Sequence, residues 1–196
     1  MKSENKALIY YILQPIFLTV AILIIVLTFM CRLAVVDGPS MQNTLHNNDV
    51  VLITTNYSFF DDLPSNIIPY DFSLKHGDII AVAPSDNTDN EYNIDNAYIK
   101  RIVAVEGQTI GFDTDNGAVY VDGKIIDEPY ISTDTLTGVE WEIPDIIPEG
   151  KVFVMGDNRA VSVDSRSVRI QLVDKSDIIG KVQCIVYPFD KISYVY

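Results

Sequence analysis

"AYIKRIVAVEG", residues 97–107, is a short apolar run that ends in a glycine. Its length and its β-branched residues are typical of a buried β-strand. Lys100 interrupts the run, and strict alternation places this lysine on the same face as Tyr98, Ile102 and Ala104. If that face packs into a core, burial will lower the pKa of the amine. If the strand lies at an edge, the lysine will instead block pairing or reach to water.

Similar short apolar runs continue along the chain on both sides of this segment, separated by turn residues. Beyond the first 32 residues, no run of helical period exceeds about two turns, so we expect a mainly β domain. Asp122-Gly123 predicts a two-residue hairpin turn with positive φ at both positions. The runs that we expect to form strands are Asp49 to Thr54, Gly77 to Val82, Ala97 to Val105, Ala118 to Val121, Val152 to Met155 and Lys181 to Tyr187.

Two other stretches are irregular in pattern. Residues 85–96 are polar, acidic and rich in turn residues, which predicts an exposed loop. Residues 56–74 contain several aromatic side chains. These aromatics either pack beneath their own loop or contact a membrane interface.

Residues 8–30 are 23 residues without a charged side chain. As a helix they would span roughly 34 Å, which is enough to cross a bilayer, and we expect a single transmembrane anchor. A cleaved signal peptide is the alternative, but its apolar region is usually shorter and ends at a small-x-small site. Lys2 and Lys6 precede the run and Arg32 follows it. This bias predicts residues 1–7 in the cytoplasm and residues 31–196 outside the membrane.

Composition limits the classes of partner. The 196 residues carry a formal net charge of −13, and residues 33–196 hold 11 basic and 26 acidic residues. Binding to phosphate backbones requires clustered lysine and arginine, so nucleic acid is not expected as a partner. Cys31 and Cys184 match no metal-ligand spacing, and we expect two free thiols.

Three segments carry candidate catalytic residues. Ser40 follows Gly-Pro in "DGPSMQNTL", a turn that can present a hydroxyl, although most such serines only bond their own backbone. A serine nucleophile needs a base. The histidines, His46 and His76, lie in polar turns, and the other candidate is Lys100. The third segment, residues 156–166, alternates acids and arginines and predicts a hydrogen-bonded network or a solvated loop.

In this order, "GPSMQNTL" (38–45), "YIKRIVAVEG" (98–107) and "GDNRAVSVDSR" (156–166) resemble the type I signal peptidases. The similarity extends to "IIGKVQCIVYPF" (178–189) and so covers nearly the whole chain. It implies an N-terminal transmembrane helix followed by a mainly β Ser/Lys peptidase domain. A smaller β-rich insertion is expected at about residues 107–150, between the Lys100 strand and the 156–166 motif.

The resemblance also implies roles for individual residues. Ser40 is expected to be the nucleophile and Lys100 its general base, while the hydroxyl of Ser162 orients the lysine amine. The backbone N–H of Ser40 is expected in the oxyanion hole, where some relatives add a hydroxyl at the position of Gly38. The supporting ion pairs are expected to be Asp157 with Arg101 and Asp164 with Arg166. The substrate pocket is expected at Val36, Met41, Leu45, Tyr98 and Ile99.

The implied substrates are secretory preproteins, bound by strand addition and cut after a small-x-small motif at the lipid bilayer. No metal or other cofactor is implied. Asn43 stands where relatives usually have proline, and "VAVEGQ" (103–108) replaces a commoner "IGLPGD". Two other interpretations are a self-cleaving repressor-type Ser/Lys peptidase and a catalytically silent scaffold. The first would be soluble with a DNA-binding module, and the second would lack Ser40, Lys100 or Ser162.

Overall fold

The computed structural model describes residues 2–55, 73–83, 97–113, 115–132 and 138–195. The loop predicted at residues 85–96 lies outside these ranges, as does nearly all of the irregular stretch at residues 56–74. The elements, in chain order, are α1 (Lys2–Met30), β1 (Cys31–Val35), β2 (Val50–Thr55), β3 (Ile79–Val82), β4 (Tyr98–Val105), β5 (Ile110–Asp113), β6 (Ala118–Val121), β7 (Lys124–Ile125), β8 (Lys151–Met155), β9 (Val173–Asp174), η2 (Lys175–Asp177), β10 (Ile178–Tyr187), η3 (Phe189–Lys191) and β11 (Ser193–Tyr194).

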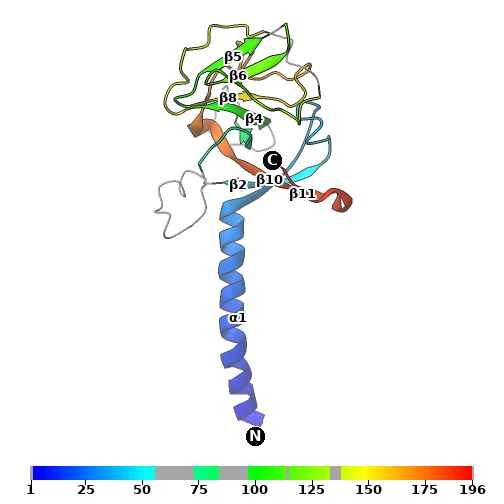
Figure 1. Ribbon diagram of the computed structural model, residues 1–196. Helices are drawn as coiled ribbons and strands as arrows, with labels where there is room; N and C mark the ends of the chain where they lie inside the picture. Colours follow the sequence, from blue (N-terminus) through cyan, green and yellow to red (C-terminus); the bar gives the residue numbers. More distant parts are fainter. Residues whose placement is uncertain (1, 56–72, 84–96, 114, 133–137, 196) are drawn as a thin grey trace.

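Helix α1 extends away from a β-rich domain, with the N-terminus at its far end (Figure 1). The helix begins at Lys2, before the apolar run, and ends at Met30. Strand β1 starts at the next residue, Cys31. Across the residues whose placement the structure describes, no helix combines the length and the apolar character needed to cross a membrane.

An antiparallel sheet of eight strands forms most of the domain, in the order β1-β2-β10-β3-β4-β8-β9, with β11 paired to β10. The six runs predicted as strands are confirmed as β2, β3, β4, β6, β8 and β10, with ends shifted by up to three residues. Strand β4 lies between β3 and β8 from Arg101 onward, whereas residues 98–100, which include Lys100, pair with β3 alone. Within the described strands Lys100 therefore has an open backbone edge on one side, but the residue is only 4% exposed and its side chain does not reach to water.

A second, three-stranded sheet, β5-β6-β7, occupies residues 110–125 and lies at the end of the domain away from α1 (Figure 1). The hairpin predicted at Asp122-Gly123 is confirmed, because Val121 pairs with Lys124 and the two turn residues have φ of 52° and 72°. Strands β1, β5, β9 and β11 were not predicted.

The core has three apolar clusters around β4. Ile102 packs in the cluster that contains Ile80 and Val154, whereas Val103 and Ala104 both pack in the cluster that contains Phe153. The prediction that Ala104 shares a face with Ile102 is therefore wrong. The register with β8 shifts between these two residues, and such a bulge interrupts the alternation of faces.

Cys31 and Cys184 are free, as expected.

Candidate active site

Ser40 and Lys100 meet between two parts of the main sheet. Ser40 lies in the turn that joins β1 to β2, and Lys100 is the third residue of β4. The Lys100 Nζ atom lies 3.1 Å from Ser40 Oγ and 3.0 Å from the carbonyl oxygen of Ile99. Only 4% of Lys100 is exposed, while Ser40 is partly exposed. The serine is thus accessible to a substrate, and its hydroxyl contacts an amine that is almost fully shielded from water.

Burial lowers the pKa of Lys100 from 10.5 to about 8, because the charged ammonium loses its hydration. Asp164 and then Asp157 oppose this effect, since their negative charges favour the ammonium. An amine with a pKa near 8 is neutral in roughly one molecule in ten at pH 7, far more often than a lysine with the ordinary value. It can therefore accept a proton from a hydroxyl.

Asp157 is held by the neighbour of Lys100 along β4. Arg101 donates from Nε to Asp157 Oδ1 at 2.9 Å and from Nη2 to Oδ2 at 2.7 Å. The same guanidinium donates to the carbonyl oxygen of Gly77 and to the Thr44 hydroxyl, which in turn donates to Asp157 Oδ2 at 2.5 Å. Asp157 and Arg101 are 0% and 1% exposed, so this is a buried, bidentate pair.

Asp164 forms a second buried pair, with Arg166. The Arg166 Nε atom lies 2.9 Å from Asp164 Oδ1, and its Nη2 atom lies 3.0 Å from Oδ2. Asp164 also accepts a hydrogen bond from the backbone N–H of Gly156, and Arg166 donates to the carbonyl oxygen of Arg159. The segment 156–166 is therefore a closed hydrogen-bonded network and not a solvated loop.

Ser162 lies in this network but is not bonded to Lys100. Its hydroxyl oxygen is buried and has no hydrogen-bond partner within the described ranges. The oxygen is close to the active site, because a Cβ built on Gly156 would be 2.3 Å from Ser162 Oγ and 2.5 Å from the Ser40 carbonyl oxygen. An unpartnered buried hydroxyl is costly, which favours its pairing in some other state of the site.

A cavity of about 110 Å³ opens beside the Ser40 hydroxyl. Four of the five predicted pocket residues line it, namely Val36, Met41, Tyr98 and Ile99. Leu45 is not among the lining residues. It is 0% exposed and packs in the core cluster with Met41 and Val51.

The backbone groups near Ser40 differ in whether they have a hydrogen-bond partner within the described part of the protein. The N–H of Gly38 donates to the side-chain oxygen of Asn47 at 3.0 Å, and Gly38 has φ of 96°. The carbonyl oxygen of Ser40 accepts from the N–H of Asn158 at 3.0 Å. Among the described residues the N–H of Ser40 donates to no protein acceptor.

Neither histidine contacts the serine in the described part of the chain. The side chain of His46 is 52% exposed and lies 3.9 Å from Asp49. The Nδ1 atom of His76 is 2.8 Å from the carbonyl oxygen of Val103. A Ser/His pair is not what the fold brings together.

Four further residues complete this site and were not predicted from the sequence. Thr44 bonds both members of the Arg101 pair, the ring of Tyr130 lies over Arg101, and Glu128 pairs with Arg159. Arg159 was noted only as part of a charged segment. No spacing in the sequence connects "DEPY" (127–130) with β4, so a contact of this kind carries no local signal.

A serine hydroxyl in contact with a desolvated base, on a mainly β domain, is suited to nucleophilic hydrolysis. The sequence matches the family described as signal peptidase, peptidase S26, over residues 9–187. It is 31% identical to signal peptidase I S of Bacillus subtilis (strain 168) over 97% of both chains. It is also 31% identical to signal peptidase IB of Staphylococcus aureus (strain MRSA252), over 97% of this chain and 95% of that protein.

A solved structure of a signal peptidase I from Enterococcus faecalis V583 aligns with 56% of this chain and 98% of that one, at 25% identity and a TM-score of 0.42. On the sequence match, the chain belongs to the signal peptidase family, peptidase S26. It is a serine endopeptidase of the signal peptidase I type.

Proposed function

We propose that this enzyme removes N-terminal signal peptides from secreted preproteins, with Ser40 as nucleophile and Lys100 as general base. The observation that carries the proposal is the 3.1 Å contact between Lys100 Nζ and Ser40 Oγ in a site where burial lowers the pKa of the amine to about 8. The names of the relatives supply the substrate class.

In the first half of the reaction, neutral Lys100 accepts the Ser40 proton as Oγ attacks the carbonyl carbon of the scissile bond. The negative oxygen of the tetrahedral intermediate accepts a hydrogen bond from the Ser40 N–H. The ammonium of Lys100 then protonates the leaving amine, the C–N bond breaks, and the signal peptide remains esterified to Ser40. In the second half, water gives a proton to Lys100 and attacks the ester. That proton passes from Lys100 to Ser40 Oγ as the ester bond breaks, and the signal peptide leaves as a carboxylic acid, which then gives its proton to water.

The two ion pairs assist the base through charge. Asp157 and Asp164 both raise the pKa of Lys100, and an unpaired carboxylate would do so more strongly. Arg101 and Arg166 partly compensate these charges at hydrogen-bond distance. They therefore help to keep the amine deprotonated in the working pH range.

Ser162 is proposed to orient the Lys100 amine. The ammonium has three donors, and two are used by Ser40 and Ile99. The buried, unpartnered Ser162 hydroxyl beside the Ser40 backbone is the acceptor that supports this role. The hydrogen bond would form when the amine moves within the loaded site.

The small cavity supports a requirement for small side chains next to the cut bond. Its lining residues Val36 and Met41 are 4% and 1% exposed, so the walls belong to a packed core. Beside it, residues 98–100 of β4 pair with β3, and β8 joins β4 only from Arg101 onward. Within the described strands this leaves one backbone edge open to an extended substrate.

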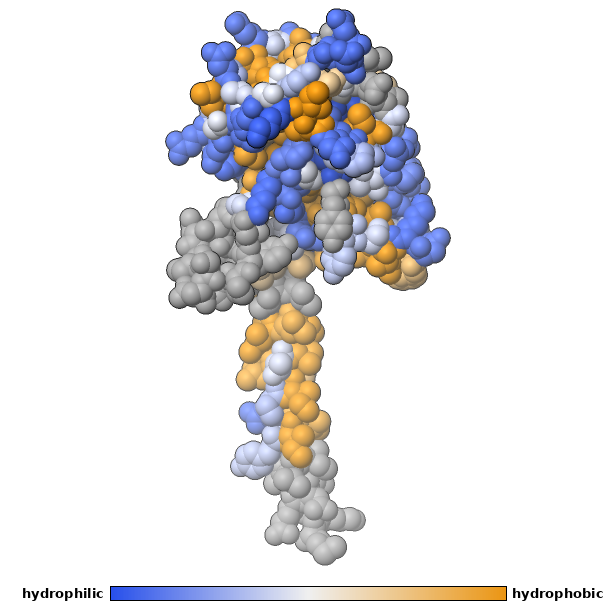
Figure 2. Space-filling model, in the orientation of Figure 1, coloured by the Kyte–Doolittle hydropathy of each residue, from blue (hydrophilic) through white to orange (hydrophobic). Residues whose placement is uncertain are grey.

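We also propose that α1 anchors the enzyme in the membrane, with residues 31–196 on the outer side. Residues 8–30 contain no charged side chain. Tyr10, Phe17 and Ile24 are 71%, 77% and 58% exposed, and the described surface of the helix is largely apolar (Figure 2). Such a surface is costly in water. Alkaline extraction of cell membranes should leave the full chain in the pellet, and its release would contradict the anchor.

The test of function is mass spectrometry of a purified preprotein incubated with the full-length enzyme. The wild type should cut one bond after a small-x-small motif, with a rate that rises with pH toward about 8. Ser40→Ala and Lys100→Ala should abolish the cut while His46→Ala retains it. Activity in Lys100→Ala would refute the assignment of Lys100 as the general base.

A further inference from the structure

Residues 128–132 follow the small sheet and contact Arg101, Asp157 and Arg159 of the buried network beside Lys100. The ring of Tyr130 lies over the guanidinium of Arg101, with the Arg101 Cζ atom 3.8 Å from the ring centroid. Two residues further on, the N–H of Ser132 donates to the carbonyl oxygen of Asp157 at 3.1 Å. The segment thus contacts both members of the buried ion pair between Arg101 and Asp157.

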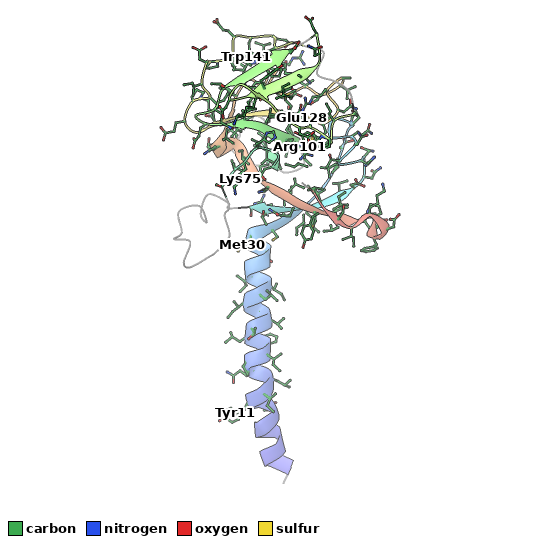
Figure 3. The ribbon with its side chains drawn as sticks, in the orientation of Figure 1. Tyr11, Met30, Lys75, Arg101, Glu128 and Trp141 are labelled. Atoms are coloured by element: carbon green, nitrogen blue, oxygen red, sulfur yellow. The ribbon has the colours of Figure 1, made fainter. Side chains whose placement is uncertain are left out.

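Glu128 fixes the other end of the same segment. It accepts hydrogen bonds from both terminal nitrogens of Arg159, and the Tyr130 hydroxyl donates to its Oε1 atom at 3.1 Å. Only 6% of the Glu128 side chain and 1% of the Arg159 side chain are exposed. Figure 3 shows Arg101 and Glu128 on the same part of the domain.

The contacts of Arg101 explain why this stacking matters. In the plane of the guanidinium, the donors are directed to Asp157, Gly77 and Thr44. A planar guanidinium with its edge occupied is left with its two faces as packing surfaces. Tyr130 covers one face and excludes water there, which strengthens the ion pair and holds it in one geometry.

We propose that Tyr130 is a positioning residue of the catalytic site, which acts through Arg101 on the carboxylate of Asp157 and so on Lys100. The inference rests on the proposed roles of Ser40 and Lys100. It means that residues 128–132 help to position the catalytic groups. The role requires a flat aromatic ring at position 130 that can cover the guanidinium, and it does not depend on the Tyr130 hydroxyl.

Loss of the Tyr130 ring should raise the pKa of Lys100. Water would reach Arg101, and the pair with Asp157 would loosen. The negative charge of Asp157 would then be less compensated, and this charge favours the ammonium form of Lys100. The acid limb of the pH-rate profile should therefore move to higher pH.

The experiment measures kcat, KM and the pH-rate profile of the full-length enzyme on a fluorogenic signal-peptide substrate. Tyr130→Ala should lower kcat roughly 10- to 100-fold with little change in KM. Its acid limb should move up by roughly 0.5 pH unit. Tyr130→Phe, which keeps the ring, should restore both quantities to near the wild-type values. Tyr120→Ala, in β6 of the small sheet, is the matched control, and it should lower stability without moving the limb.

A Tyr130→Ala enzyme with an unmoved limb and an unchanged kcat would overturn the inference, as would failure of Tyr130→Phe to restore them. Ser40→Ala is assayed in parallel. Activity in that variant would refute the proposed function itself, whereas a silent Ser40→Ala with a normal Tyr130→Ala refutes only the positioning role.

Discussion

Gly156 faces the carbonyl oxygen of Ser40 so closely that a Cβ on this glycine would be 2.5 Å from that oxygen. The loop after β8 therefore packs directly on the turn that contains Ser40, and a hydrogen bond from Asn158 N–H to the same oxygen fixes the contact. Residue 156 therefore has no room for a side chain in this arrangement.

Gly156→Ala should therefore lower kcat/KM about 100-fold, because the new methyl group must displace the Ser40 backbone or the Ser162 hydroxyl. Gly111→Ala is the matched control, since a Cβ there would meet Tyr120 at an ordinary 3.8 Å. The measurement is steady-state cleavage together with circular dichroism to show that both variants fold. Wild-type activity in Gly156→Ala would disprove this close contact.

Lys100→Met should abolish activity and stabilise the fold at neutral pH. The pKa of Lys100 is about 8 when folded and 10.5 ordinarily, so the unfolded chain holds its proton more tightly. The cost of burying the ammonium is fully present below pH 8, declines as pH rises from 8 to 10.5, and is absent above that range.

Urea denaturation should accordingly show Lys100→Met more stable than wild type by about 3 kcal/mol at pH 7. The difference should shrink toward zero by pH 10.5. A gap that stays constant across this range would contradict the origin of the lowered pKa in burial.

Thr44→Val tests the hydroxyl that joins the turn containing Ser40 to the pair of Arg101 and Asp157. The substitution leaves a buried carboxylate oxygen and an arginine N–H each short of a partner. We expect a loss of about 1–3 kcal/mol in the free energy of unfolding and a lower kcat. Thr44→Ser keeps the hydroxyl and should lose much less of both. Equal behaviour of the two variants would show that the methyl group, and not the hydrogen bond, is important.

The strands were the most predictable part of the fold. Short β-branched runs between turn residues identified β4, β6 and β8, and the positive φ required at Asp122 and Gly123 identified the hairpin. Strand β1 was missed because its sequence, "CRLAV", directly continues the apolar run of α1. The bulge in β4 was missed because it depends on the register with β8, which is a property of the partner strand.

The site was predictable where a motif surrounds each residue. Ser40, Lys100 and the pairs of Asp157 and Asp164 each lie in a recognisable segment, and the fold brings them together. Tyr130 lies outside these segments and stacks on Arg101, which is 29 positions earlier in the chain, and the sequence has no periodic signal for such a contact. Leu45 lies one turn from Met41, but its side chain is used by the core.

The junction of α1 and β1 has one more consequence. The helix ends at Met30, the strand begins at Cys31, and β1 pairs with β2 along its whole length, from Cys31 with Thr54 to Val35 with Val50. In the anchored enzyme that we propose, no flexible tether separates the bilayer from the catalytic sheet. The junction then holds Ser40 at a fixed distance from the membrane surface. A bond would be selected by its distance from the membrane as well as by its side chains, and suitable motifs farther along a secreted protein would be spared.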